Sequence, residues 1–236
     1  MVWVFFPKYK VEGVENLPEE AAVIVGNHCK ANGPIVSQLY MPREGYTWCI
    51  AQMMHIKEVP NYSFTDFWSG KPKWTHPFYH LASYIIAPLA AFIFTHADTI
   101  GVYKDKRVLK TFTESAEKMG AGADVIIFPE CYDEHNNIVH DFQRGFVDVA
   151  RLDYKKNKRN TPFVPMYLAP SLKKVIFGKP IYYDPTNPPK EEAERIIAYL
   201  QNEISELAYA QPPHKVVTYN NIRKKYYPTN VRQNEE

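Results

Sequence analysis

Short apolar segments, each closed by a polar or proline-containing turn, constrain the fold of this chain more than any other feature. Residues 21–27 read Ala-Ala-Val-Ile-Val-Gly-Asn, and residues 124–128 read Asp-Val-Ile-Ile-Phe before Pro129. Runs of this length and composition indicate buried strands. Further strands are expected at 47–53, 163–168, 175–177 and 181–183. Pro165 predicts an edge or a bulge for its strand, because proline cannot donate to a ladder.

Helical patterns lie between the expected strands. One helix is expected to begin at Asn32, and others at 105–119, 145–156 and 190–210. In the last of these, Ile196, Ile197, Leu200, Ile204 and Leu207 fall on one face. Strands that alternate with helices predict an α/β fold, with a central sheet covered by helices. In such folds ligands bind beyond the carboxyl ends of the strands.

Charge and cysteine content narrow the functional class. The 236 residues carry a formal net charge of +2, which gives no reason to expect a nucleic-acid partner. The three cysteines, Cys29, Cys49 and Cys131, form no Cys-x-x-Cys pair. We therefore expect neither a disulfide framework nor a structural zinc site, and a reducing, cytoplasmic setting. The apolar run at residues 2–7 is too short for a signal-peptide core, so we expect no secretion.

Residues 55–97 have an unusual composition. Trp68, Trp74, Lys71 and Lys73 precede residues 81–94, which are almost entirely apolar. That run is too short for a secure membrane span of about 20 residues. One interpretation is a buried core helix with a kink at Pro88. The other is a half-inserted, membrane-facing helical pair with an aromatic and basic collar, and we favour it because this is the interfacial pattern.

Three positions are candidates for chemistry. His28 follows a predicted strand and precedes a helix start, where an imidazole can act as a general base; the alternative is a loop histidine bonded to the backbone. Glu130 follows Pro129 at another strand end, and the alternative is a helix cap or a surface charge. Lys104, with Arg107 after it, follows a short strand and could hold a phosphate; the alternative is a solvated lysine.

Several short motifs along the chain, including those around His28 and Glu130, occur in the order found in one enzyme family. The chain resembles the 1-acyl-glycerol-3-phosphate acyltransferase family over residues 11 to about 185. Each motif is weak alone, but together they form a specific series. The matching segments are Val11–Pro18, Asn27-His28, Ile100–Lys104, Phe128-Pro129-Glu130, Phe142–Gly145, Val164–Met166 and Phe177–Pro180.

The resemblance implies a glycerolipid-acyltransferase-like fold and an acyl transfer. His28 would deprotonate the hydroxyl of a lysophospholipid or related glycerolipid, which then attacks the thioester of acyl-CoA or an acyl carrier protein. These are co-substrates, and no cofactor is expected. Besides His28, the residues expected to bind substrate are Asn27, Lys104, Arg107, Phe128, Pro129, Glu130 and Arg144.

Two departures from the family pattern affect the expected site. The family has an aspartate five residues after its histidine, and here that residue is Gly33. Asn32 is the nearest substitute, because its amide oxygen can accept a hydrogen bond from His28 Nδ1–H. If the backbone tolerates a side chain, Gly33→Asp should raise the rate. The family's Gly-Thr-Arg after the glutamate is replaced by Cys131-Tyr132-Asp133, which weakens the expectation of a phosphate on the acceptor.

Other interpretations stay open. The chain could be a catalytically silent lipid- or acyl-binding protein on the same scaffold, or a thiol-based enzyme that uses Cys29 or Cys131 with His28. The residues at 133–135 and 140–141 could bind a metal, but loop histidines explain them better and we predict none. We expect one domain over 1–236, with 55–97 as a membrane-facing insertion and 211–236 as a C-terminal tail, located at the cytoplasmic face of a membrane.

Overall fold

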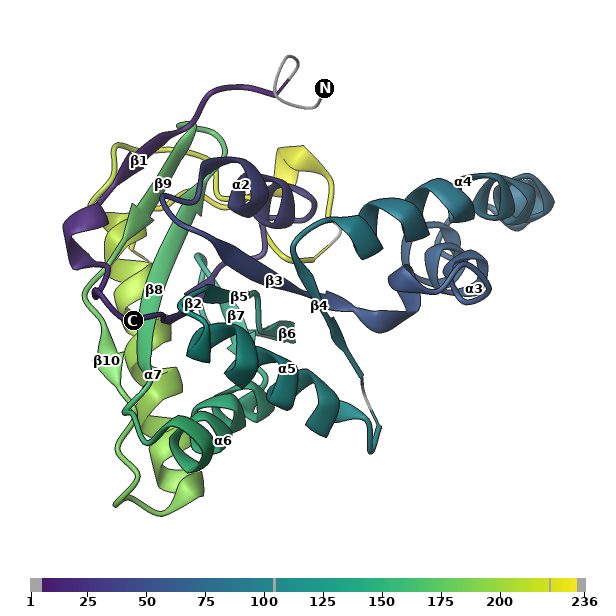
Figure 1. Cartoon of the computed structure of the whole chain (residues 1–236). Coiled ribbons are helices and arrows are strands. Elements are labelled where there is room, and N and C mark those ends of the chain that lie inside the picture. The colour runs from purple at the N-terminus through teal and green to yellow at the C-terminus, as the bar shows by residue number, and fades with distance from the viewer. Residues whose placement is uncertain (1–5, 104, 221, 233–236) are drawn as a thin grey trace. The chain divides into compact units, whose positions relative to one another are not determined.

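The computed structural model describes residues 6–103, 105–220 and 222–232 (Figure 1). The chain divides into two compact units. The first comprises Met1–Gly45 and Phe112–Glu236, and the second comprises Tyr46–Thr111. The second unit therefore contains the whole segment of unusual composition, and His28 and Glu130 both belong to the first.

A mostly parallel sheet forms the centre of the first unit. Its strands are β1 (Lys10–Glu12), β2 (Val23–Gly26), β5 (Asp124–Ile127), β8 (Pro162–Ala169), β9 (Lys174–Phe177) and β10 (Ile181–Tyr182). The order is β1-β9-β8-β2-β5, and β10 also pairs with β8. Strand β2 is parallel to both β5 and β8, whereas β8 is antiparallel to β9 and β10. Parallel neighbours bring the carboxyl ends of β2, β5 and β8 to one edge.

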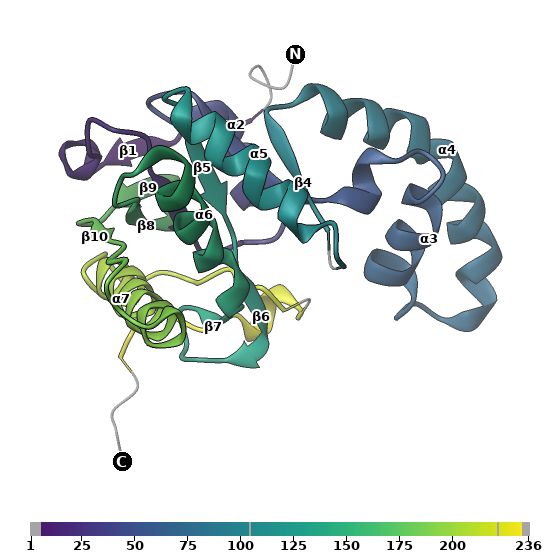
Figure 2. The ribbon, with the colours of Figure 1, turned by 60° about the horizontal axis from the view of Figure 1, so that its bottom comes forward.

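Alternation along β8 explains how this sheet is covered. Val164, Met166 and Leu168 join Ile24, Ile126 and Val36 of α2 (Asn32–Tyr40) in one buried cluster. The opposite side of β8 packs against α7 (Pro189–Tyr209). Of the predicted apolar face of this helix, Ile196, Ile197, Leu200 and Ile204 are buried, whereas Leu207 is only partly buried. Figure 2 shows α7 along one side of the strands. Helices α5 (Val108–Gly120) and α6 (Asp148–Asn157) complete the helical elements around the sheet.

Of the two alternatives predicted for Pro165, an edge or a bulge, the edge is wrong. Strand β8 lies inside the sheet, between β2 and β9. Pro165 is tolerated there because it falls between the residues that pair with β10, 162–163, and those that pair with β9, 166–169. Its carbonyl still accepts a hydrogen bond from the Gly178 N–H at 2.8 Å. The missing donor therefore coincides with a local interruption of the ladder.

The sequence did not predict one further element, the hairpin of β6 (Glu130–Glu134) and β7 (His140–Phe142). Most of β6 after Glu130 is exposed and polar, so it lacks the apolar alternation that reveals a strand. The two strands pair antiparallel, with Glu130 opposite Phe142. The hairpin begins at Glu130 itself, and it brings residues of the expected polar loop to the candidate site.

The second unit is built on a parallel pair and helices. Strands β3 (Gly45–Ile50) and β4 (Thr99–Val102) pair in parallel. Between them lie 3₁₀ helix η2 (Ala51–Met54), α3 (Val59–Ser63), π-helical η3 (Phe64–Trp68), 3₁₀ helix η4 (Lys73–Thr75) and α4 (His76–His96). Helix α4 has 21 residues, which is longer than the apolar run that the sequence suggested. By length and composition, Lys73–His96 could cross a membrane.

Helix α4 packs with small residues and exposes large ones. Its buried residues are Ser83, Ala87 and Ala91, spaced one helical turn apart, and Ala87 and Ala91 pack with Met53 and Val59. The exposed side chains form a broad apolar face: Phe78, Leu81, Tyr84, Ile85, Leu89, Phe92 and Ile93. Only 17% of its most apolar window is buried. The buried-core interpretation of this segment is therefore wrong, since a core helix buries its large side chains.

Candidate active site

His28 lies in a strained turn directly after β2. Cys29 and Lys30, which follow it, have φ angles of 47° and 57°. Two successive non-glycine residues in the left-handed region cost free energy and persist only where surrounding bonds enforce them. Those bonds are present, since the Asn32 and Gly33 N–H groups donate to the Cys29 and His28 carbonyls at 3.1 and 3.2 Å. The turn is thus built to hold His28 in one place.

Asn27 fixes the start of this turn. Its side chain is buried, and its Nδ2 donates to the Leu168 carbonyl at 3.0 Å while its Oδ1 accepts from the Leu168 N–H at 2.7 Å. The amide therefore ties the end of β2 to β8 through two bonds. These bonds give Asn27 a structural task, and its expected part in substrate binding stays a prediction.

Glu130 holds the turn from the other side. Its side chain is 3% exposed. One carboxylate oxygen, Oε2, accepts from the His28 backbone N–H at 2.6 Å, and Oε1 accepts from the His140 N–H at 2.9 Å. Burial raises the pKa of Glu130, and the two backbone donors partly oppose that rise. An ionised carboxylate suits this site, because both oxygens face donors.

His28 and Glu130 thus lie at the carboxyl ends of neighbouring strands. Strand β2 pairs in parallel with β5, which ends just before Phe128 and Pro129. The Phe128 ring meets the His28 imidazole edge-on, with ring centroids 5.5 Å apart and an interplanar angle of 68°. Nδ1 of His28 is buried.

The contact of Tyr219 with His28 was not predicted. The Tyr219 ring contacts the His28, His140 and Tyr132 rings, with centroids 5.6, 5.9 and 5.6 Å apart. His140 is buried on β7, although the sequence suggested a loop histidine. The available signal was the high aromatic content of the chain, but nothing local to residue 219 indicated a contact with residue 28.

The backbone around Gly33 leaves no room for a side chain at that position. A Cβ on Gly33 would lie 2.3 Å from the His28 carbonyl oxygen and 3.1 Å from a Phe128 ring carbon. Because the nearest atom belongs to the backbone, it cannot rotate away. Asn32 uses its Nδ2 to donate to the Cys29 carbonyl at 3.0 Å. Its expected role as the acceptor for His28 stays a prediction.

The environment of Cys29 argues against thiol chemistry at that residue. Cys29 is fully buried, and its Sγ accepts from Asn27 Nδ2 at 3.0 Å. Burial raises the pKa of the Cys29 thiol well above its usual value, and the charge of Glu130 adds to the rise. A thiolate is the reactive form of cysteine. Cys29 is therefore a poor nucleophile at neutral pH.

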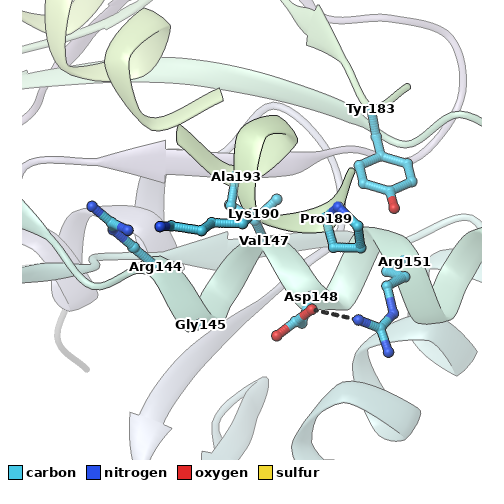
Figure 3. A pocket seen from close by; sticks show the side chains of 9 residues that line it. All are labelled: Arg144, Gly145, Val147, Asp148, Arg151, Tyr183, Pro189, Lys190 and Ala193. Carbon is cyan, nitrogen blue, oxygen red and sulfur yellow. Dashed lines mark ion pairs between the residues drawn. The ribbon is translucent and has the colours of Figure 1, made fainter. Parts of the chain in front are cut away.

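The predicted substrate-binding cations lie in different surroundings. Arg144 pairs with Glu194 at 2.9 Å and lines a pocket of about 270 Å³ beside the start of α7. Figure 3 shows Arg144 and Lys190 together there, and the lining includes neither His28 nor Glu130. Arg107, in the second unit, is exposed and pairs with Asp105 at 2.7 Å. Lys104 lies outside the described residues.

In the acidic and histidine-containing segment of the hairpin, one histidine contacts one carboxylate. His135 Nδ1 lies 3.4 Å from Asp141 Oδ1, and both side chains are partly exposed. Within residues 6–103, 105–220 and 222–232, no group of three or more histidine, cysteine or carboxylate side chains could hold a metal ion.

Comparisons with known proteins bear on the fold. No protein-family model matches the sequence, and no curated protein matches it. Among solved structures, the chain is similar to the crystal structure of the 1-acyl-sn-glycerophosphate (LPA) acyltransferase PlsC from Thermotoga maritima. The TM-score is 0.51 and the identity 17%, over 89% of this chain and 76% of that chain. Similarity at this identity concerns the backbone arrangement. The predicted α/β fold, a mostly parallel central sheet covered by helices in the arrangement of a glycerolipid acyltransferase, is confirmed.

Proposed function

We propose that this protein is an acyltransferase that moves a fatty acyl group from a thioester to the hydroxyl of a lysophospholipid or related glycerolipid. The observation that carries the proposal is the hydrogen bond between Glu130 and the His28 backbone, at the carboxyl ends of neighbouring parallel strands. In an α/β sheet this edge is where ligands bind. The similarity of the fold to a lysophosphatidic acid acyltransferase supports the same reaction class.

The proposed reaction needs one base and one electrophile. His28 takes the proton of the acceptor hydroxyl, and the oxygen attacks the carbonyl carbon of acyl-CoA or an acyl carrier protein thioester. The tetrahedral intermediate then collapses, the C–S bond breaks, and the thiolate leaves with the proton returned by the His28 imidazolium. One C–O bond replaces one C–S bond, and no proton or electron is gained or lost overall, so the step balances with these two substrates alone. Glu130 acts through the backbone, by fixing the turn that carries His28.

We further propose that the protein works at the cytoplasmic face of a membrane, where its acceptor resides. The support is the apolar face of α4, on which Leu81, Ile85 and Leu89 are 61%, 69% and 62% exposed. A contiguous apolar surface of this kind marks an interaction site. Trp74, 84% exposed, and the neighbouring Lys73 lie just before the helix and match the composition of an interfacial anchor.

A catalytically silent lipid- or acyl-binding protein is the second candidate. Gly33 favours it, because that residue stands where the family's orienting carboxylate would be, and the backbone there excludes any side chain. The two functions differ in product formation, since a binding protein retains the acyl chain without transferring it.

The proposal is tested with purified protein, labelled acyl-CoA and vesicles that contain a panel of lysolipids, with products identified by mass. A lysolipid whose mass increases by one acyl group, with equimolar release of free CoA, supports the enzyme. Binding of acyl-CoA without transfer to any acceptor supports the silent scaffold. CoA release without an acylated lipid would contradict both, since it indicates hydrolysis.

A further inference from the structure

Beyond α7, two described segments of the chain pair with each other. Lys215 and Thr229 form an isolated antiparallel bridge, and the Val216 N–H donates to the Pro228 carbonyl at 2.9 Å. The sequence analysis predicts only a C-terminal tail at residues 211–236. Residues 214–220 and 222–230, here named the C-terminal loop, lie beyond the part of the chain that resembles the acyltransferase family. In Figure 2 the yellow end of the chain runs beside β6 and β7.

One buried asparagine anchors the base of the C-terminal loop. Asn230 is 4% exposed, and its Nδ2 donates to the Ala208 and Gln211 carbonyls at 2.7 and 3.0 Å. Its Oδ1 accepts from the His214 N–H at 2.8 Å. The amide thus joins both ends of the loop to the end of α7, without involving the aromatic residues at the loop's tip.

The same loop contacts the turn that follows His28. Lys30 Nζ donates to the Tyr227 hydroxyl at 2.9 Å and lies 5.1 Å from the centroid of that ring. On the hairpin side, Asn137 Nδ2 donates to the Thr229 and Val231 carbonyls at 2.7 and 2.8 Å. The C-terminal loop therefore spans from the carboxyl edge of β2 to the β6–β7 hairpin.

Within that span Tyr219 reaches the imidazole of His28. The two rings are 5.6 Å apart with an interplanar angle of 75°, and Phe128 makes a similar edge contact with the imidazole at 68°. His140 and Tyr132 of the hairpin contact the Tyr219 ring in turn. Edge-to-face contacts of this kind favour one mutual orientation of the rings. Two of them restrict rotation of the imidazole about its bond to Cβ.

We propose that Tyr219 is a positioning residue for His28, and that the C-terminal loop completes the acyltransferase site. This inference rests on the proposed function. Because Gly33 provides no side chain to orient the imidazole, the aromatic contacts of Tyr219 and Phe128 supply part of that orientation. The ring of Tyr219 is the active part, so phenylalanine should replace it and an aliphatic residue should not.

The test compares Tyr219→Leu and Tyr219→Phe with Tyr226→Leu as the matched control. Tyr226 lies in the same loop, is 63% exposed, and its ring contacts Lys225. Thermal unfolding first establishes that each variant is folded, which the separate Asn230 anchor favours. Two readouts follow: the kcat and KM for acyl transfer, and the imidazole NMR signals of His28, assigned from their loss in His28→Gln.

We expect Tyr219→Leu to lower kcat about two- to tenfold, with KM for the acyl donor unchanged. It should also shift the His28 imidazole signals, because a neighbouring ring has been removed. Tyr219→Phe should have the wild-type kcat and His28 imidazole signals. Tyr226→Leu should change neither kcat nor these signals. The proposal is overturned if the His28 signals are the same in wild type and Tyr219→Leu, or if Tyr219→Phe fails as badly as Tyr219→Leu. The NMR readout needs no activity, so it decides the contact even if the wild type transfers no acyl group.

Discussion

Glu130 accepts a hydrogen bond from the backbone N–H of His28 at 2.6 Å, across the ends of two adjacent parallel strands. The carboxylate therefore controls the position of the histidine through the main chain rather than through the imidazole. Its second oxygen accepts from the His140 N–H, so a single buried side chain connects the His28 turn to the β6–β7 hairpin. Substitutions that keep its size but alter its acceptors should separate this role from direct contact with substrate.

Glu130→Gln should destabilise the protein and lower its activity. A glutamine has one acceptor oxygen, so one of the two backbone donors would face an amide NH₂ group. Hydrogen bonds to a charged group contribute about 1.5–3 kcal/mol, and a buried donor left unpaired costs a similar amount. We expect a loss of about 1–3 kcal/mol in the free energy of unfolding, measured by urea denaturation.

The control for this substitution is Glu134→Gln, at the exposed end of the same strand. It should leave stability within about 0.5 kcal/mol of wild type. Equal stability of wild type and Glu130→Gln would show that the two backbone bonds are dispensable.

Gly33→Ala and Gly33→Asp should both destabilise the protein. The added Cβ would lie 2.3 Å from the His28 carbonyl oxygen, so the turn must move, at a cost of about 1–3 kcal/mol. The same movement displaces His28, so acyl transfer should fall. This reverses the expectation from the sequence, in which Gly33→Asp raises the rate, because the condition that the backbone tolerates a side chain is not met.

Gly145→Ala is the matched control, since a Cβ there would meet no atom within 4 Å. Thermal unfolding and initial rates are measured on all three variants. A Gly33→Asp protein as stable as wild type and faster would show that the turn accepts a carboxylate.

Asn32→Ala should lower the rate of acyl transfer sharply. Asn32→Asp then distinguishes whether the donor or the acceptor of the Asn32 side chain is needed. The Asn32 Nδ2 donates to the Cys29 carbonyl, whereas the sequence predicts that its oxygen accepts from His28. An aspartate keeps the acceptor and loses the donor. If the acceptor matters, Asn32→Asp retains activity while Asn32→Ala does not. If both variants lose activity equally, the bond to Cys29 is the essential one, and the predicted orienting role of Asn32 is refuted. Initial rates of acyl transfer provide the comparison.

A helix or strand could be predicted where its own residues carry a recognisable hydrophobic pattern. Strands β2 and β5 and helix α7 carry their pattern locally, as an apolar run or as a helical stripe, and each was predicted within a few residues of its bounds. The β6–β7 hairpin was not, because its polar residues are held by Glu130 and by pairing rather than by burial of an apolar face.

The residues of the candidate site also differ in whether a local sequence pattern identifies them. His28 and Glu130 could be predicted because each follows a recognisable strand, and parallel pairing then brings them together. Tyr219 could not, because its contact with His28 joins residues that are 191 positions apart through a loop with no strong local pattern. The tolerance of Pro165 inside the sheet depends on where β9 and β10 stop pairing, which is also a tertiary property.

Charges on the exposed face of α4 should abolish membrane binding. Ile85, Leu89 and Phe92 are 69%, 62% and 60% exposed. Burying each in lipid contributes about 1.5–3 kcal/mol, so changing all three to aspartate should reduce vesicle binding by more than about a thousandfold. Co-flotation with liposomes measures it.

Leu109→Asp is the control for this triple variant, because Leu109 is 65% exposed on a different helix, α5. It should float as wild type does. If the triple variant and the wild type float equally, α4 is not the membrane-binding surface.

The measurement that tests the account most directly is the initial rate of acyl transfer by His28→Ala. A general base contributes about 10²- to 10⁴-fold to rate, so the rate should fall by at least about a hundredfold while the thermal unfolding midpoint stays close to that of wild type. His135→Ala, which removes a partly exposed histidine paired with Asp141, should transfer acyl groups at the wild-type rate. A folded His28→Ala protein that acylates its lysolipid as fast as wild type would contradict the assignment of His28 as the base, and with it the proposed site.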